Sequence, residues 1–78
     1  MAHWDYEKRA IKTMTDEQLL GEYQQAVKAR FDRLFGRNAA VYQNIVADEL
    51  HKRGITSFPG LFGPIEIEKA FPFNQAIR

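Results

Sequence analysis

Apolar side chains recur every three or four positions along the first half of the chain, a spacing that places them on one side of an α-helix. The members of this stripe are Leu19, Leu20, Tyr23, Val27, Phe31, Leu34 and Phe35. Residues 15–18 read Thr-Asp-Glu-Gln, a capping-box pattern in which the Thr15 hydroxyl and the Gln18 side chain each satisfy a free backbone amide. Gly36 can adopt the left-handed conformation that closes a helix. The sequence therefore predicts a helix that begins after Thr15 and ends at Gly36.

A second apolar stripe begins soon after Gly36 and again follows helical spacing. Its members are Tyr42, Ile45, Val46 and Leu50. The pattern predicts a helix over residues 39–53 that stops at Gly54, with Ile55 placed to contact the last turn in a Schellman ending. Because the connection is short, the two helices are expected to fold back on one another as an antiparallel hairpin over residues 15–54.

A short leading helix is expected before this hairpin. Residues 5–11 are rich in side chains that favour helices. Trp4 and Ile11 flank this segment and are its candidate anchors.

The segment after the hairpin is harder to assign. Residues 58–64 read Phe-Pro-Gly-Leu-Phe-Gly-Pro, a density of proline and glycine that argues against regular structure. Residues 65–68 alternate isoleucine with glutamate, the pattern of a half-buried strand. Pro64, in contrast, suits the first position of a helix. Since a lone strand would need a second copy or a partner to pair with, we favour a short helix after Pro64.

Phenylalanine is concentrated in residues 55–78, and this tail decides the predicted fold. Two helices alone bury only one face each, so the tail is expected to pack across the hairpin. In this interpretation Phe58 and Phe62 complete the core, and apolar side chains near the end of the tail serve a partner. The residues assigned to that partner surface are Phe71, Phe73 and Ile77. The alternative is that the whole tail belongs to the core. Either way the expected fold is all-α, in a single domain of residues 1–78.

Length and composition limit how such a fold is stabilised. A chain of 78 residues buries only about 60–65% of the surface that its unfolded form exposes. Disulfides are excluded because the chain has no cysteine, and its two histidines, far apart, show no metal-site spacing. No cofactor is expected. Binding to a partner remains, with a homodimer as one option.

The charge pattern excludes several classes of partner. A net charge of +1 does not indicate a general attraction to nucleic acid or to anionic membranes. Residues 1–12 lack the apolar core of a signal peptide, and no apolar run approaches the length of a membrane span. The absence of cysteine fits a reducing compartment. The expected location is the cytoplasm.

No arrangement of residues in the sequence indicates catalysis. There is no cysteine nucleophile, and neither Ser57 nor any threonine has a histidine and carboxylate nearby in sequence. We therefore expect the protein not to be an enzyme.

Glu49 and Arg53 project along the middle of the second apolar stripe and form an acid-to-base pair four residues apart. One interpretation is a solvated pair at the edge of the hairpin. The other is a buried or interfacial pair that sets the register with another protein, and on this basis both residues join the candidate partner surface.

Basic residues interleaved with aromatic ones mark the end of the first predicted helix. They are Lys28, Arg30, Arg33 and Arg37. Such a pattern can grip phosphates and stack bases, so a nucleic-acid-binding protein is the alternative function. Cations also stabilise a helix C-terminus, which makes nucleic acid the less favoured partner.

Residues 15–20 leading into a helix, a glycine-containing turn, and a second helix ending in residues 49–55 resemble the small helical-hairpin accessory proteins of bacteriophages and mobile elements. The resemblance covers about half of the chain and assigns no functional residue. It implies a protein that acts stoichiometrically by binding and blocking a host complex, including nucleic-acid-targeting defence machinery, in the host cytoplasm if a phage encodes the chain. The leading hypothesis is accordingly a small protein–protein interaction module.

Overall fold

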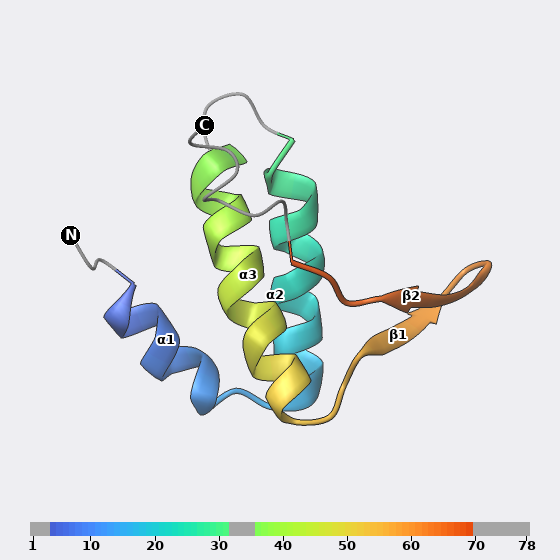
Figure 1. Cartoon of the computed structure of the whole chain (residues 1–78), viewed down its shortest axis with the longest axis horizontal. Coiled ribbons are helices and arrows are strands. Elements are labelled where there is room, and N and C mark those ends of the chain that lie inside the picture. The colour runs from blue at the N-terminus through green and yellow to red at the C-terminus, as the bar shows by residue number, and fades with distance from the viewer. Residues whose placement is uncertain (1–3, 32–35, 70–78) are drawn as a thin grey trace.

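Three helices and one β-hairpin make up the part of the chain that the computed structural model describes, residues 4–31 and 36–69 (Figure 1). The elements are α1 (Asp5–Lys12), α2 (Asp16–Ala29), α3 (Gly36–Lys52), β1 (Ser57–Gly60) and β2 (Gly63–Glu66). Helices α2 and α3 lie side by side and run in opposite directions, and α1 and the β-hairpin lie on opposite sides of them. The antiparallel helical hairpin and the leading helix are thus confirmed.

The expected all-α fold is wrong, because β1 and β2 form an antiparallel sheet and the fold is α+β. The sequence favours a short helix after Pro64, on the ground that a strand there would lack a partner. The partner is the segment immediately before it, since Phe58 pairs with Ile65 and Pro59 with Pro64. Gly63, with a φ of 127°, supplies the positive backbone angle that lets the chain reverse.

The predicted start of α2 is confirmed, and its predicted end is wrong. The Thr15 hydroxyl accepts a hydrogen bond from the Gln18 amide (3.1 Å), and the Gln18 side chain accepts one from the Thr15 amide (2.9 Å). However, α2 ends at Ala29, where the chain tightens into a turn, and Phe31 is 74% exposed instead of continuing the apolar stripe. Gly36 begins α3 instead of closing α2.

The end of α3 has the Schellman geometry that the sequence predicted. Gly54 has a φ of 83°, and its amide donates to the His51 carbonyl. The Ile55 amide donates to the Leu50 carbonyl at 2.9 Å, and Ile55 packs against the core.

The core lies between α2 and α3, and residues of α1 and of the segment after β2 complete it. Its buried members are Ile11, Leu19, Tyr23, Val46, Ala47, Leu50 and Ile67. Ile11 attaches α1 as predicted, and the Trp4 ring stacks on Tyr42 with 6.3 Å between ring centroids. No helix in the described part of the chain is both long and apolar enough to cross a membrane.

Three side chains of the helical hairpin hold the backbone that follows β2. The Tyr23 hydroxyl accepts a hydrogen bond from the Glu68 amide (3.0 Å), and the Gln43 side-chain amide donates to the Glu68 carbonyl (2.9 Å). The His51 ring nitrogen Nε2 donates to the Ile67 carbonyl (2.8 Å), because a carbonyl oxygen can only accept. We call Tyr23, Gln43 and His51 the backbone clamp. It fixes the base of the β-hairpin on the helices.

The two phenylalanines expected in the core lie in different environments. Phe58 packs against the core and meets the Tyr23 ring edge to face, at 6.1 Å between centroids. Phe62 is 99% exposed, so the expectation that it completes the core is wrong. It lies in the turn between the strands, beyond the reach of the helices. Phe71, Phe73 and Ile77 lie outside the described residues.

The contrast between Phe58 and Phe62 gives a matched test of the fold. Phe58→Ala should lower the free energy of unfolding by about 2–3 kcal/mol, because it empties a partly buried site against Tyr23. Phe62→Ala should change it by less than about 0.5 kcal/mol, as for other surface substitutions. Urea unfolding followed by circular dichroism measures both. Equal destabilisation would show that Phe62 packs on the body.

Tyr42 links α2 to α3 and makes stability depend on pH. Its hydroxyl donates a hydrogen bond to the Glu22 carboxylate (2.9 Å). Burial, and then this hydrogen bond, raises the pKa of the Tyr42 hydroxyl well above its usual range. The unfolded chain therefore loses this proton at a lower pH than the folded one.

Stability should consequently fall as the pH rises above about 10, the ordinary pKa of tyrosine. Below that pH both states keep the proton, and the contribution is fully present. Tyr42→Phe cannot ionise, so its free energy of unfolding should fall less steeply between about pH 9 and pH 11. Parallel slopes for the two proteins in urea unfolding would contradict this origin of the pH dependence.

Candidate protein-binding surface

The turn of the β-hairpin presents the most exposed large apolar side chains of the described residues. Leu61 is 91% exposed and Phe62 99%, and Ile65 behind them is 46% exposed. Figure 1 shows the hairpin projecting away from the helices, in agreement with the exposure of Leu61 and Phe62 at its turn. We call Leu61, Phe62 and Ile65 the tip.

The hairpin carries no charged side chain from Ser57 to Ile65. The first charges after these residues are Glu66 and Glu68. Both glutamates are exposed. A surface of this kind fits an apolar site on a protein, while the flanking carboxylates oppose contact with nucleic acid or anionic lipid.

Proline controls the edges of the hairpin. Pro59 and Pro64 lie opposite each other in the register and have no amide hydrogen to donate. In an antiparallel pair without ladder hydrogen bonds, the amide positions face outward, so each proline removes a donor from one free edge. Neither edge is therefore a good template for an added strand, and the hairpin can bind mainly through its side chains.

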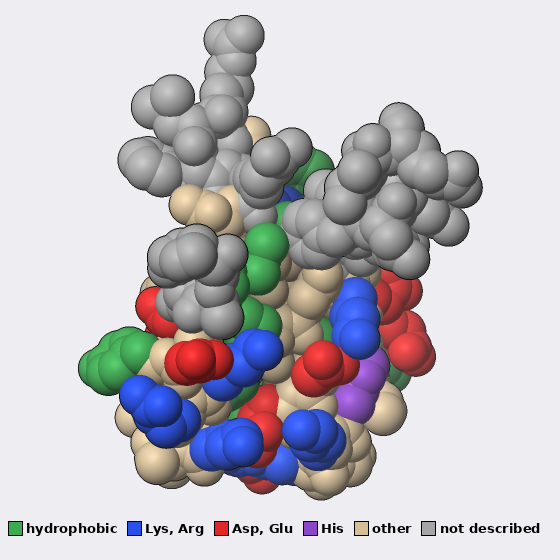
Figure 2. All heavy atoms as spheres, turned by 60° about the vertical axis from the view of Figure 1, so that its left-hand side comes forward, with side chains coloured by type: hydrophobic (Ala, Val, Ile, Leu, Met, Phe, Trp, Pro, Cys, Tyr) green, Lys and Arg blue, Asp and Glu red, His purple; other side chains and the backbone are tan. Residues whose placement is uncertain are grey.

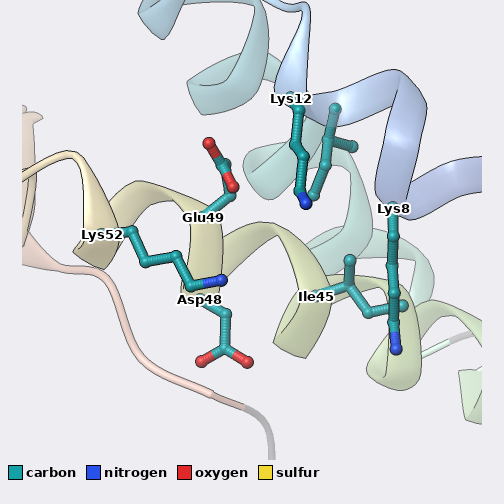
Figure 3. A pocket seen from close by; sticks show the side chains of 7 residues that line it. Lys8, Lys12, Ile45, Asp48, Glu49 and Lys52 are labelled. Carbon is teal, nitrogen blue, oxygen red and sulfur yellow. The ribbon is translucent and has the colours of Figure 1, made fainter.

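A second surface feature is a cleft of about 200 Å³ between α1 and α3. Figure 3 shows Lys8 and Lys12 extending from α1 toward α3, with Ile45 between the two helices. The full lining is Lys8, Ile11, Lys12, Ile45, Asp48, Glu49 and Lys52. The cleft thus combines two isoleucines with three lysines. We call it the lysine cleft.

The two carboxylates of the lysine cleft are already neutralised. Asp48 pairs with Lys69 (3.0 Å) and Glu49 with Arg53 (3.0 Å). Within the described residues, no ion pair or hydrogen bond engages the ammonium groups of the three lysines. Figure 2, which brings the α1 side forward, shows basic side chains gathered on this face with acidic ones between them. Three positive charges of the cleft thus have no counterion among residues 4–31 and 36–69.

Arg53 forms an intramolecular network that neither interpretation of its pair with Glu49 anticipated. Its guanidinium donates to the Glu49 and Asp16 carboxylates and to the carbonyls of Met14 (2.8 Å), Ile11 (3.2 Å) and Lys12 (3.2 Å). The side chain is only 21% exposed. The hydrogen bond to Asp16, followed by that to Glu49, raises the pKa of Arg53 above its usual value. Arg53 therefore joins the end of α1 to the start of α2, and a direct role in partner binding stays a prediction.

The candidate nucleic-acid residues are only partly described. Lys28 is exposed, and the Arg30 guanidinium lies over the Phe31 ring, 4.9 Å from its centroid. Arg33 and the side chain of Arg37 lie outside the described part. The structure thus places one cation of the predicted patch on an aromatic ring, and of the four side chains it describes those of Lys28 and Arg30.

Sequence reasoning missed the tip as a surface. The signal was present, because two apolar segments separated by a short glycine-containing loop are typical of a β-hairpin. Leu61 and Phe62 occupy that loop and so have no place in the core. Gln43, which is buried, was also missed, since polar residues on a helix are ordinarily assigned to solvent.

The chemistry of the described residues supplies no metal site, since no group of three or more potential ligands gathers there. No family model, curated protein or solved structure matches this chain. Any functional proposal therefore rests on the surfaces themselves.

The Arg53 network should hold α1 in place. Arg53→Ala removes the guanidinium that donates to the Ile11, Lys12 and Met14 carbonyls. Arg53→Lys cannot span these carbonyls because an ammonium lacks the planar fork. Both variants should lower the melting temperature and speed amide hydrogen exchange in α1, with α2 and α3 less affected. Lys52→Ala, at an exposed neighbour, is the control. Unchanged exchange in α1 would contradict this role.

Proposed function

We propose that the protein is a non-enzymatic protein–protein interaction module that binds its partner stoichiometrically through the tip. The observation that carries this proposal is the near-complete exposure of Phe62 on a hairpin whose base is anchored by the backbone clamp. An aromatic side chain held away from the core in this way contributes nothing to folding. Buried in a partner's pocket, it is a typical hot spot.

The anchored base supports this proposal on energetic grounds. A side chain on a mobile loop loses conformational freedom on binding, and this loss opposes association. Here three hydrogen-bonding side chains fix the backbone next to β2, and Phe58 packs the base of β1 against Tyr23. The tip therefore stands on a preorganised support. Residues 58–65 also carry no acid, base or nucleophile, which fits binding better than catalysis.

The finer parts of the proposal follow the resemblance to bacteriophage helical-hairpin proteins. On that basis the partner is a host complex, the action is inhibition by occupying a surface, and the location is the host cytoplasm. Phe71, Phe73 and Ile77 stay candidate contributors to the same binding event. The nucleic-acid alternative remains a prediction that the same experiment can test.

Affinity capture with matched variants tests the proposed function. The tagged protein is incubated with nuclease-treated host lysate, and any captured protein is purified and titrated by calorimetry. Phe62→Ala should weaken this binding by about 30-fold or more, as expected for a hot spot. Phe31→Ala, which removes another exposed phenylalanine, should leave it unchanged.

Three results would contradict the proposal. One is a captured protein that binds Phe62→Ala as tightly as the unmodified protein. Another is the retention of no protein at all. Retained nucleic acid that is lost on digestion, with affinity falling steeply as salt increases, would favour the basic residues instead.

A further inference from the structure

We infer that the lysine cleft receives the tip of a second copy of this chain. The inference rests on the proposed function for the tip as a docking surface and commits to one partner, a second copy of this chain. The two surfaces match in size, in polarity and in charge, and they lie on opposite sides of the molecule.

The size of the cleft suits one aromatic side chain. A cavity of about 150 Å³ lined by apolar residues is large enough to bind benzene. The lysine cleft measures about 200 Å³, and Ile11 and Ile45 supply apolar surface within it. The volume of the cleft is therefore sufficient for the phenyl ring of Phe62. Its transfer there would remove from water a ring that is now 99% exposed.

The charges around the two surfaces are complementary. The cleft has three lysines without counterions among the described residues, Lys8, Lys12 and Lys52. The hairpin continues into Glu66 and Glu68, both exposed and both without an ion pair in the described chain. When an uncharged tip enters the cleft, carboxylates behind it come to the rim where the ammonium groups lie. A small inorganic anion would meet the lysines but leave the isoleucines uncovered.

The contact must be between molecules. The backbone clamp fixes the hairpin on one side of α2 and α3, and α1 lies on the other side (Figure 1). A tip therefore cannot reach the cleft of its own chain. Each copy offers one tip and one cleft, so the association is head to tail.

The expected affinity is low. A buried aromatic side chain contributes on the order of 150–250 Å², whereas each partner in a stable interface buries about 800 Å². A single tip falls well short of this area. Association should therefore depend on protein concentration, and it should weaken at high salt because the rim charges are exposed.

Sedimentation equilibrium with a pair of complementary variants tests the inference. Phe62→Ala removes the aromatic side chain of the tip and keeps the cleft. Lys8→Glu with Lys52→Glu reverses the charge at two positions of the cleft and keeps the tip. The unmodified protein should gain average mass between about 10 µM and about 1 mM, a range that covers weak dissociation constants. Each variant alone should stay monomeric. Their equimolar mixture should form a 1:1 pair and nothing larger, because one intact tip and one intact cleft remain.

Controls separate this contact from nonspecific association. Phe31→Ala should associate like the unmodified protein, and circular dichroism should show that every variant is folded. If the double charge reversal unfolds the chain, Lys8→Gln with Lys52→Gln replaces it and should weaken association by about tenfold.

Several results would overturn the inference. They are a monomer at every concentration, unchanged association of Phe62→Ala, and association of the charge-reversed variant by itself, which would indicate contact between tips. A monomer that still captures a foreign protein through Phe62 would refute the inference and leave the proposed function standing.

Discussion

The exposed hairpin depends on hydrogen bonds between helix side chains and the backbone at residues 67–68. Tyr23, Gln43 and His51 approach this backbone from two helices, while Ile67 is buried in the core between them. Each bond joins residues far apart in sequence. Leaving the buried Gln43 amide unpaired would lower the free energy of unfolding. Because the clamp acts next to β2, it fixes where the hairpin leaves the body. The turn beyond it then has no surface to pack on, and Leu61 and Phe62 remain in solvent.

The helical body provides the support that the clamp requires. A chain of this size without disulfides has a small core. Hydrogen-bond networks between side chains and backbone therefore contribute strongly to holding its helices and hairpin together. Arg53 does this at one end by joining three carbonyls near the end of α1 to two carboxylates. Tyr42 joins α3 to α2 by its hydrogen bond to Glu22, and the Trp4 ring stacks on the Tyr42 ring. The same attachment of α1 to α3 leaves the lysine cleft between them.

Local signals in the sequence predicted what local interactions determine. The capping box at Thr15, the Schellman ending at Gly54 and the antiparallel pairing of the two long helices are confirmed. The predicted end of α2 is wrong because the helical spacing of apolar residues continues past Ala29, where the backbone instead tightens into a turn. The sequence does not predict the β-hairpin because its first strand lies in the segment rich in proline and glycine, residues that usually interrupt strands. In the structure, Pro59 and Pro64 lie opposite each other at positions where no ladder hydrogen bond is needed. The roles of Arg53 and Gln43 depend on contacts between distant residues, which spacing along one helix does not reveal.

The account depends most on Phe62 being exposed while Phe58, four positions earlier, is packed. Proton NMR at low protein concentration with a soluble nitroxide measures this directly, since the radical broadens ring protons that solvent reaches. The account predicts strong broadening of Phe62, comparable with a free amino acid, and much weaker broadening of Phe58. Nuclear Overhauser contacts should join Phe58 to Tyr23 and none should join Phe62 to the helices. Equal protection of the two rings, or contacts from Phe62 to α2 or α3, would contradict the account.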